Sequence, residues 1–324
     1  MMPNRSNFLH QQREPCIEQN MNRLLENQID VFMSVRQVSN YLHVNEKKIY
    51  ALVNEGHIPA TKITGKWMFP KELIDKWMLD STHNGLLHDR LIITGSDDPL
   101  LYRIVLEFAE TLGNKALITY TSTGTRPGLD LLNANKVDAC CIHWGPESES
   151  NRRHPSLIQQ YSKHHNWVLI RAFKREQGLI FKSSNLDTTP IIPELFNPSY
   201  RWSIRQKGSG AQRFLMEILS KYGLNQDGLN STTTSLSERE AASSIILKKS
   251  DISVGTRAIA NEFGLDFISL GWQAFDFVIP RNIWFRHLFQ NLIASLKSDF
   301  GQEVAFNLGG YKLNQCGDLI WGED

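Results

Sequence analysis

Between positions 33 and 78 the apolar residues recur at the spacing of three short helices. The inward-facing positions expected of these helices are Val35, Val38, Tyr41 and Leu42, then Ile49, Leu52 and Val53, then Leu73, Ile74 and Trp77. Ser34 and Asn45 are favourable N-cap residues for the first two helices, and Gly56 can end the second in a left-handed conformation. A two-stranded hairpin is expected next, and Pro70 is expected to open the third helix at its first position.

Beyond position 90 the pattern changes to short apolar strands that alternate with amphipathic helices. Strands are predicted over 91–94, 116–120, 137–143, 167–170, 178–181, 201–205, 252–254, 267–270 and 275–279. Helices are predicted over 99–112, 127–133, 209–222, 237–248 and 283–298. This alternation predicts a mostly parallel sheet covered by helices. Because the pattern restarts near position 167, we expect two lobes and a cleft rather than one continuous sheet.

The first of these regions resembles the excisionase/MerR-type winged helix-turn-helix domains. The family pattern is a recognition helix with a buried tyrosine, a G-x-I-P-A step and a basic G-K/R-W wing. The matching segments here are Val44–Tyr50, Gly56–Ala60 and Gly65–Trp67. The resemblance covers the whole module and implies that double-stranded DNA is a partner.

Charge agrees with a DNA-binding role that is confined to this module. The chain has 324 residues, of which 41% are hydrophobic and 21% charged, and its net charge is only +1. A protein that is basic throughout is therefore excluded. Positive residues gather locally at Arg36, Lys47, Lys48, Lys62, Lys66 and Lys71. A local basic face is typical of a specific reader that meets phosphates on one side.

The sequence shows no signal for a membrane or for the cell exterior. No apolar run approaches the roughly 20 residues that span a bilayer, and the first 30 residues contain no signal-peptide core. The four cysteines, Cys16, Cys140, Cys141 and Cys316, lack metal-ligand spacing. We therefore expect reduced cysteines in a cytoplasmic protein. The adjacent Cys140 and Cys141 should point to opposite faces of their strand.

Three turns rich in glycine and hydroxyl residues lie where a predicted strand gives way to a helix. They cover Gly95–Pro99, Thr121–Gly128 and Arg205–Arg213. In the third turn, free backbone amides at Gly208 and Gly210 and the start of a helix predict a cradle for an anion. Any single turn could serve only as a helix cap. Because ligands of open α/β sheets bind at the carboxyl ends of strands, we expect the three to converge on a ligand.

From Leu91 to Trp321 the chain resembles the type II periplasmic-binding-protein-like domains of bacterial helix-turn-helix regulators, the class of molybdate-binding proteins and LysR effector domains. The segments that carry the resemblance are 95–101, 122–124, 138–143, 175–179, 205–210, 264–268 and 308–311. It implies an α/β fold in which a small winged helix-turn-helix is followed by a two-lobed sensor that closes on a small ligand.

These patterns together divide the chain into four parts. They are a mobile tail over 1–30, the winged helix-turn-helix over 31–80, a linker over 81–90 and the sensing domain over 91–324, with its second lobe at about 173–270.

The resemblance implies a set of ligand-binding residues at the cleft. The candidates are Ser96, Ser122, Thr123 and Ser209 as donors, Arg175, Gln177 and Arg205 as polar clamps, and Gly208 and Gly210 as backbone donors. Molybdate or tungstate is the favoured effector, and no other cofactor is implied. A small organic acid is the alternative effector, because the arginines could bind a carboxylate. The family has small or apolar residues where this chain has Thr125-Arg126, so the resemblance does not fix the identity of the ligand.

Several further side chains have two possible roles. His143 either lines the cleft or makes a structural hydrogen bond at a strand end. His164 and His165 lack acidic or cysteine neighbours, which disfavours a metal site. Five aromatic residues are expected to be core: Trp272, Phe275, Phe277, Trp284 and Phe285.

On the DNA side, the start of the recognition helix is expected to meet base edges, and the wing and first helix to meet phosphates. The candidate residues are Arg36, Asn45, Lys47, Lys48, Tyr50, Lys62 and Lys66. A single module of this size reads few bases. We therefore expect a homodimer on a two-fold operator.

The sequence thus predicts a cytoplasmic bacterial transcriptional regulator that responds to a small anion and has no catalytic activity, since no nucleophile elbow, P-loop, Rossmann fingerprint or zinc-protease motif is present. One alternative is an architectural, excisionase-like protein whose second domain only oligomerises. Another is an enzyme of cofactor or molybdenum metabolism with a DNA tether.

Overall fold

The computed structural model describes residues 32–56, 58–63, 65–80, 89–183 and 192–322, and it divides into two units, Met1–His88 and Asp89–Asp324. The predicted tail over 1–30 and most of the predicted linker lie outside the described residues.

The first unit is the predicted winged helix-turn-helix. Its elements are β1 (Phe32–Ser34), α2 (Val35–Tyr41), α3 (Glu46–Asn54), β2 (Thr61–Ile63), β3 (Lys66–Pro70) and α4 (Lys71–Asp80). The strands form one sheet in the order β1-β3-β2. Ser34 and Asn45 cap α2 and α3 through their side chains, and Gly56 has a φ of 69°, as predicted.

Small parts of the prediction for this unit are wrong. Pro70 ends β3 instead of opening α4. Tyr41 and Leu73 are 45% and 47% exposed, because the small core is already filled. That core is formed by Met33, Val35, Val38, Ile49, Val53, Ile58, Phe69 and Ile74.

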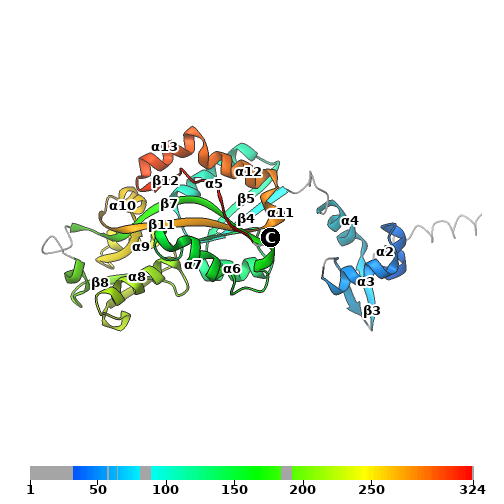
Figure 1. Ribbon diagram of the computed structural model, residues 1–324, viewed down its shortest axis with the longest axis horizontal. Coiled ribbons are helices and arrows are strands. Elements are labelled where there is room, and N and C mark those ends of the chain that lie inside the picture. The colour runs from blue at the N-terminus through cyan, green and yellow to red at the C-terminus, as the bar shows by residue number, and fades with distance from the viewer. Residues whose placement is uncertain (1–31, 57, 64, 81–88, 184–191, 323–324) are drawn as a thin grey trace, which may run out of the picture. The chain divides into compact units, whose positions relative to one another are not determined.

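The second unit is built on one ten-stranded sheet (Figure 1). The strand path is β5-β4-β6-β11-β7-β10-β8-β9, and β12 and β13 also pair with β7. The strands are β4 (Asp89–Gly95), β5 (Ala116–Ser122), β6 (Ala139–Ile142), β7 (Trp167–Phe181), β8 (Arg201–Arg205), β9 (Asn230–Ser235), β10 (Ile252–Thr256), β11 (Asp266–Pro280), β12 (Tyr311–Lys312) and β13 (Leu319–Gly322). The expectation of two separate sheets is therefore wrong.

The two long strands β7 and β11 explain the continuous sheet. Each has 15 residues, where the apolar pattern predicts two short strands. One half of each pairs with β6 or β13, and the other half of β7 pairs with β10. The pair thus runs from one lobe into the other, with an irregularity between Ser269 and Gly271 where the lobes join. In Figure 1, β7 and β11 cross the unit side by side.

Lobe I carries β4, β5 and β6, and lobe II carries β8, β9 and β10. The helices of lobe I are α5 (Pro99–Leu112), α6 (Thr125–Asn133), α7 (Ser150–Ile158), α11 (Arg281–Trp284), α12 (His287–Lys297) and α13 (Asp299–Leu308). Those of lobe II are α8 (Gly210–Lys221), α9 (Glu238–Ile246) and α10 (Arg257–Phe263). Short 3-10 turns lie at Glu147–Glu149, His164–Asn166, Ile192–Phe196 and Gln226–Gly228.

Each lobe has an apolar core on both faces of the sheet. Cys140 and Cys141 face opposite cores of lobe I, as predicted from their adjacency. Phe275 and Phe277 are fully buried core residues, and Trp284 packs against that core. Phe285 is 79% exposed, which makes its core prediction wrong, because the predicted helix over 283–298 breaks there.

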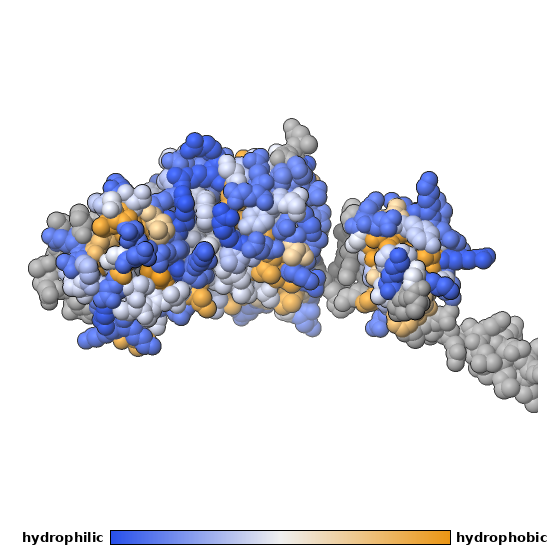
Figure 2. All heavy atoms as spheres, turned by 90° about the horizontal axis from the view of Figure 1, so that it is seen from below, coloured by the Kyte–Doolittle hydropathy of each residue, from blue (hydrophilic) through white to orange (hydrophobic). Residues whose placement is uncertain are grey.

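The surface in Figure 2 is mainly hydrophilic, and its apolar residues form only separated areas. No helix among the described residues is long and apolar enough to cross a membrane.

Candidate functional site

The three predicted turns meet where the two lobes face each other. The first two join within lobe I, because Thr123 and Gly124 donate their backbone N–H groups to Gly95 O at 3.0 and 2.7 Å. The second turn then reaches lobe II, because Arg126 N–H donates to Gly208 O at 3.1 Å. The strands β4, β5 and β8 all end at this point, so their carboxyl ends bring the turns together.

The lobes touch closely in this structure. The carboxylate of Asp97 accepts the backbone N–H of Glu238, at the start of α9, at 2.7 Å. A Cβ atom added to Gly210 would lie 2.3 Å from His143 O. The start of α8 can therefore approach lobe I only because residue 210 is a glycine.

A buried ionic group holds the lobes at the hinge. Arg175 on β7 is fully buried and places Nη1 3.0 Å from Asp98 Oδ2 and 2.7 Å from Asp97 O. Its Nη2 lies 3.1 Å from Glu238 Oε1. We call Arg175, Asp98 and Glu238 the hinge cluster. Because these carboxylates already surround Arg175, its predicted role as a ligand clamp stays a prediction.

Burial shifts the protonation equilibria around this cluster. It raises the pKa of Asp98 to about 6, although the positive charge of Arg175 opposes the shift. It also holds the pKa of His143 well below the usual 6.5, and Arg175 adds to that effect. His143 lies 3.2 Å from Arg175 Nη2 through Nδ1, and its ring stacks on Phe275. His143 is thus a neutral, buried group between the lobes.

Most predicted hydroxyl donors have partners within the chain. Ser96 Oγ lies 2.9 Å from Thr125 Oγ1, and Thr123 Oγ1 lies 2.8 Å from Thr94 Oγ1. Ser209 caps α8 by accepting the N–H of Gln212 at 3.1 Å. These hydrogen bonds stabilise the turns. The predicted contacts of the same hydroxyl groups with a ligand stay a prediction.

Three uncharged side chains on the long strands and at the end of β5 carry buried polar atoms without a hydrogen-bond partner among the described residues. Gln177 and Gln273 are 0% and 1% exposed, and neither amide nitrogen nor amide oxygen is paired. Ser122 Oγ, at the end of β5, is likewise buried and unpaired. Buried polar groups in proteins are nearly always hydrogen-bonded. Their arrangement therefore suits a polar ligand.

Gln273 is a residue that sequence reasoning missed. It lies on β11 directly opposite Arg175 on β7. The only signal for it is the strand register, which requires knowing that β7 and β11 pair.

Arg205, at the end of β8, is a buried cation with neutral partners. It is 4% exposed and donates from Nε and Nη2 to the backbone carbonyls of Ser235 and Leu236 at 3.1 Å each. No carboxylate lies within ion-pair distance of it in the part of the chain that the structure describes. Burial lowers its pKa, but an arginine stays charged. The positive charge of Arg205 is therefore better suited to bind an anion than that of Arg175, which is already paired with two carboxylates.

In the first unit the seven predicted DNA-binding residues are all exposed: Arg36, Asn45, Lys47, Lys48, Tyr50, Lys62 and Lys66. Asn45 Oδ1 accepts the N–H of Lys48 at 2.8 Å, so this side chain is used as the helix cap. Tyr50 is 45% exposed, whereas the family pattern implies that it is buried. Lys62 extends over the Trp67 ring at 5.5 Å.

Comparison with family models assigns both units. The chain belongs to the PBP superfamily, whose domain model matches residues 106–297, and it carries a helix-turn-helix domain that matches residues 32–81. Among curated proteins, it is 20% identical over 307 residues to the uncharacterized protein YvgK of Bacillus subtilis, covering 89% of this chain and 97% of YvgK.

Two solved structures share the fold. A putative phosphate ABC transporter substrate-binding protein of Clostridium perfringens, with bound phosphate, has a TM-score of 0.53 and 13% identity, covering 70% of this chain and all of that one. A hydrogen-peroxide-bound mutant of OxyR from Corynebacterium glutamicum has a TM-score of 0.51 and 11% identity, covering 85% of this chain and 90% of that one.

Proposed function

We propose that this protein is a DNA-binding transcriptional regulator whose activity depends on a small ligand held between lobes I and II. The observation that carries the proposal is the set of buried, unpaired polar atoms of Gln177 on β7, Gln273 on β11 and Ser122 at the end of β5. These atoms lie in a chain that also has a helix-turn-helix domain. The proposal includes no catalytic activity.

The ligand class we infer is a small anion. Arg205 is buried and donates to the backbone carbonyls of Ser235 and Leu236, and no carboxylate lies within ion-pair distance of it among the described residues, which suits an oxyanion. The structural neighbour with bound phosphate supports this class. Molybdate and tungstate, favoured by the resemblance, stay within it, and a small organic acid is the alternative.

The carboxylates of the cleft refine this inference. Asp97, Asp98 and Glu238 lie where the lobes meet, and an ionised carboxylate can only accept hydrogen bonds. An anion that carries a proton, such as hydrogenphosphate or a hydroxy acid, can donate to such a group. A fully deprotonated oxyanion would be repelled. We therefore expect hydrogenphosphate or a hydroxy acid to bind better than molybdate.

Ligand binding would favour the arrangement in which the lobes touch, and this population shift would change DNA affinity. We include in the proposal a homodimer on a two-fold operator. A monodisperse monomer that still binds its operator tightly would contradict that part.

The ligand is tested by thermal unfolding of the full chain with phosphate, molybdate, tungstate, sulfate and small carboxylates. A compound at 100 times its Kd should stabilise the fold by about 2.7 kcal/mol. If no compound stabilises the chain, the sensor proposal fails. The architectural alternative, in which the second domain only oligomerises, predicts that outcome.

Two variants separate ligand contact from structural support. Ser122→Ala and Gln177→Leu each remove unpaired polar atoms, so neither should lower the stability of the free protein. Each should weaken the best ligand about tenfold. The control is Ser162→Ala, which removes an exposed hydroxyl that donates to Asn133 Oδ1. Equal affinity in all three variants would place the ligand elsewhere.

DNA binding is tested on the pair Lys47→Ala and Lys48→Ala. Both side chains are exposed at the start of α3, so their joint loss should abolish operator binding and reduce the salt dependence of any remaining binding. Lys71→Gln is the control, because Lys71 Nζ is already paired with Asp75 at 2.9 Å. An unchanged affinity of the double variant would remove α3 from the DNA interface.

A further inference from the structure

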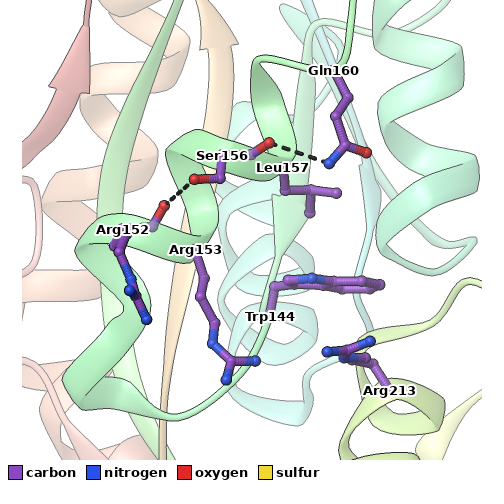
Figure 3. Close-up of a pocket in the computed structure, with 7 residues that line it drawn as sticks. All are labelled: Trp144, Arg152, Arg153, Ser156, Leu157, Gln160 and Arg213. Atoms are coloured by element: carbon purple, nitrogen blue, oxygen red, sulfur yellow. Dashed lines mark hydrogen bonds between the residues drawn. The ribbon is translucent and has the colours of Figure 1, made fainter.

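A second concave site lies outside the cleft, between α7 of lobe I and α8 of lobe II (Figure 3). It is a groove of about 440 Å³. Such a volume lies within the range of small-molecule sites. Its lining comes from the residue after His143 and from one helix of each lobe. The groove therefore borders the cleft without sharing the polar groups described above.

The groove is lined by arginines from both lobes. Arg152 and Arg153 on α7 and Arg213 on α8 line it, and no acidic residue does. The carboxylates that reach these arginines are Glu149 and Glu217, so three positive charges meet two negative ones and leave an excess of one. An anion that enters the groove is therefore attracted by one uncompensated positive charge.

The arginines differ in their freedom. Arg153 is 28% exposed and lies 2.5 Å from both Glu149 and Glu217, which fixes it. Arg213 contacts Glu217 only through Nε, at 2.9 Å, and Arg152 is 80% exposed, 3.4 Å from Glu149. The terminal nitrogens of Arg152 and Arg213, one from each lobe, are the groups that suit an added anion.

The floor of the groove is apolar. Trp144 provides it, because Leu157 behind it is only 2% exposed, and in Figure 3 the Trp144 ring lies between Leu157 and the guanidinium group of Arg213. The guanidinium groups of Arg126 and Arg213 lie 5.2 and 6.0 Å from the ring centre of Trp144. Gln160 is held at the rim by Arg126 at 3.3 Å. An inorganic ion alone would not use this apolar surface.

We propose that the groove between α7 and α8 is a second effector site for an organic anion. Its anionic group is held by Arg152 and Arg213, and its apolar part lies against Trp144. Because these arginines belong to different lobes, the bound anion links lobe I to lobe II. The site is independent of the ligand proposed for the cleft.

The test is calorimetric titration of the full chain with phenyl phosphate, compared with inorganic phosphate. Phenyl phosphate should bind about tenfold more tightly, because its ring covers the apolar floor. Arg213→Ala should weaken it about tenfold through loss of a charge-assisted hydrogen bond. The matched control is Arg103→Ala on α5, since Arg103 is similarly exposed, at 44% against 48%, and also has one carboxylate partner.

Three outcomes decide the proposal. Selective loss of phenyl phosphate binding in Arg213→Ala, with Arg103→Ala within about twofold of wild type, supports it. Equal losses in the two variants overturn it, because the effect is then one of general charge. Binding that survives Arg213→Ala but is lost in Gln177→Leu also overturns it, because the compound then occupies the cleft. In that case the cleft proposal still stands.

Discussion

Two arginine–carboxylate clusters join the same pair of lobes, and they differ in exposure to water. In the hinge cluster, Arg175, Asp98 and Glu238 are at most 1% exposed. In the second, which we call the groove cluster, Arg153, Arg213 and Glu217 are 26% to 48% exposed. The chemistry is the same, but water competes only for the second. The ion pairs of the hinge cluster are therefore shielded from water, whereas the groove cluster stays accessible to a solute.

Burial determines how much the free energy of unfolding falls when an ion pair of each cluster is broken. A buried charge that loses its partner keeps the full penalty of its removal from water, whereas an exposed charge is solvated again. The comparison therefore predicts large effects at the hinge and small ones at the groove.

The largest effect is expected for Arg175→Met. The change leaves the carboxylates of Asp98 and Glu238 buried without their cation, so the free energy of unfolding should fall by about 3–5 kcal/mol. Urea unfolding measures this. Adding Glu238→Gln should recover part of the loss, because it removes one uncompensated charge. A loss below about 1 kcal/mol would mean that the hinge cluster behaves like a surface pair.

A smaller effect is expected for Gly210→Ala. The added Cβ would lie 2.3 Å from His143 O and 2.4 Å from His143 Nε2, both in the opposite lobe. Overpacking of this kind costs about 1–3 kcal/mol, or it forces the lobes apart. Urea unfolding and small-angle scattering separate the two results. Gly228→Ala is the control, because a Cβ there has space. Equal unfolding energies and radii for both variants would contradict the lobe contact.

The next prediction concerns pH and the buried His143. Its folded pKa is below the unfolded value of 6.5, so its stabilising contribution is present above pH 6.5 and is lost as the pH falls. The free energy of unfolding should therefore fall as the pH is lowered from about 7 to about 5.5. His143→Gln should lack this contribution. The measurement is urea unfolding of both proteins at each pH, and parallel pH profiles would contradict the prediction.

Asp98, which like His143 contacts Arg175, is expected to have a pH dependence of the opposite sign. Its folded pKa, about 6, lies above the unfolded 3.8, so its contribution is present below pH 3.8 and is lost as the pH rises through 6. Asp98→Asn should therefore lack the fall in the free energy of unfolding that Asp98 causes as the pH rises from about 4 to about 6. This change is opposite in sign to the one expected for His143→Gln. Asparagine is also a good N-cap, so α5 is kept.

The sequence predicted the elements whose signals are local. The bounds of α5 were predicted correctly because Pro99 begins the helix and Asp98 caps it. The three turns were found because glycine and hydroxyl residues mark strand ends. The exposed lysines of α3 follow from the same local pattern.

Features that depend on distant partners could not be predicted. The polar residues in the middle of β7 interrupt its apolar pattern, yet Arg171 is buried because Asp276 on β11 lies 2.5 Å away. Arg175 was predicted as a ligand clamp, a role that stays a prediction, and its partners Asp98 and Glu238 could not be predicted because they are far from it in the sequence. The helix α7 was missed because Pro155 lies within it and its sequence is mostly polar. The groove was missed with it.

The smallest effect on stability is expected for Glu217→Gln, and it sharpens the comparison most. Glu217 is 26% exposed and pairs with Arg153 and Arg213, so its loss should lower the free energy of unfolding by only about 0.2–1 kcal/mol, and less at high salt.

The effect of Glu217→Gln on anion binding in the groove should be larger. With one carboxylate gone, three arginines meet one glutamate, and the excess positive charge rises from one to two. Phenyl phosphate should then bind more tightly than to wild type, measured by the same titration. The matched change at the hinge, Glu238→Gln, should lower stability more and leave phenyl phosphate binding unchanged. If Glu217→Gln instead weakens binding, Glu217 serves to hold the arginines in place, and the two clusters are alike in being structural.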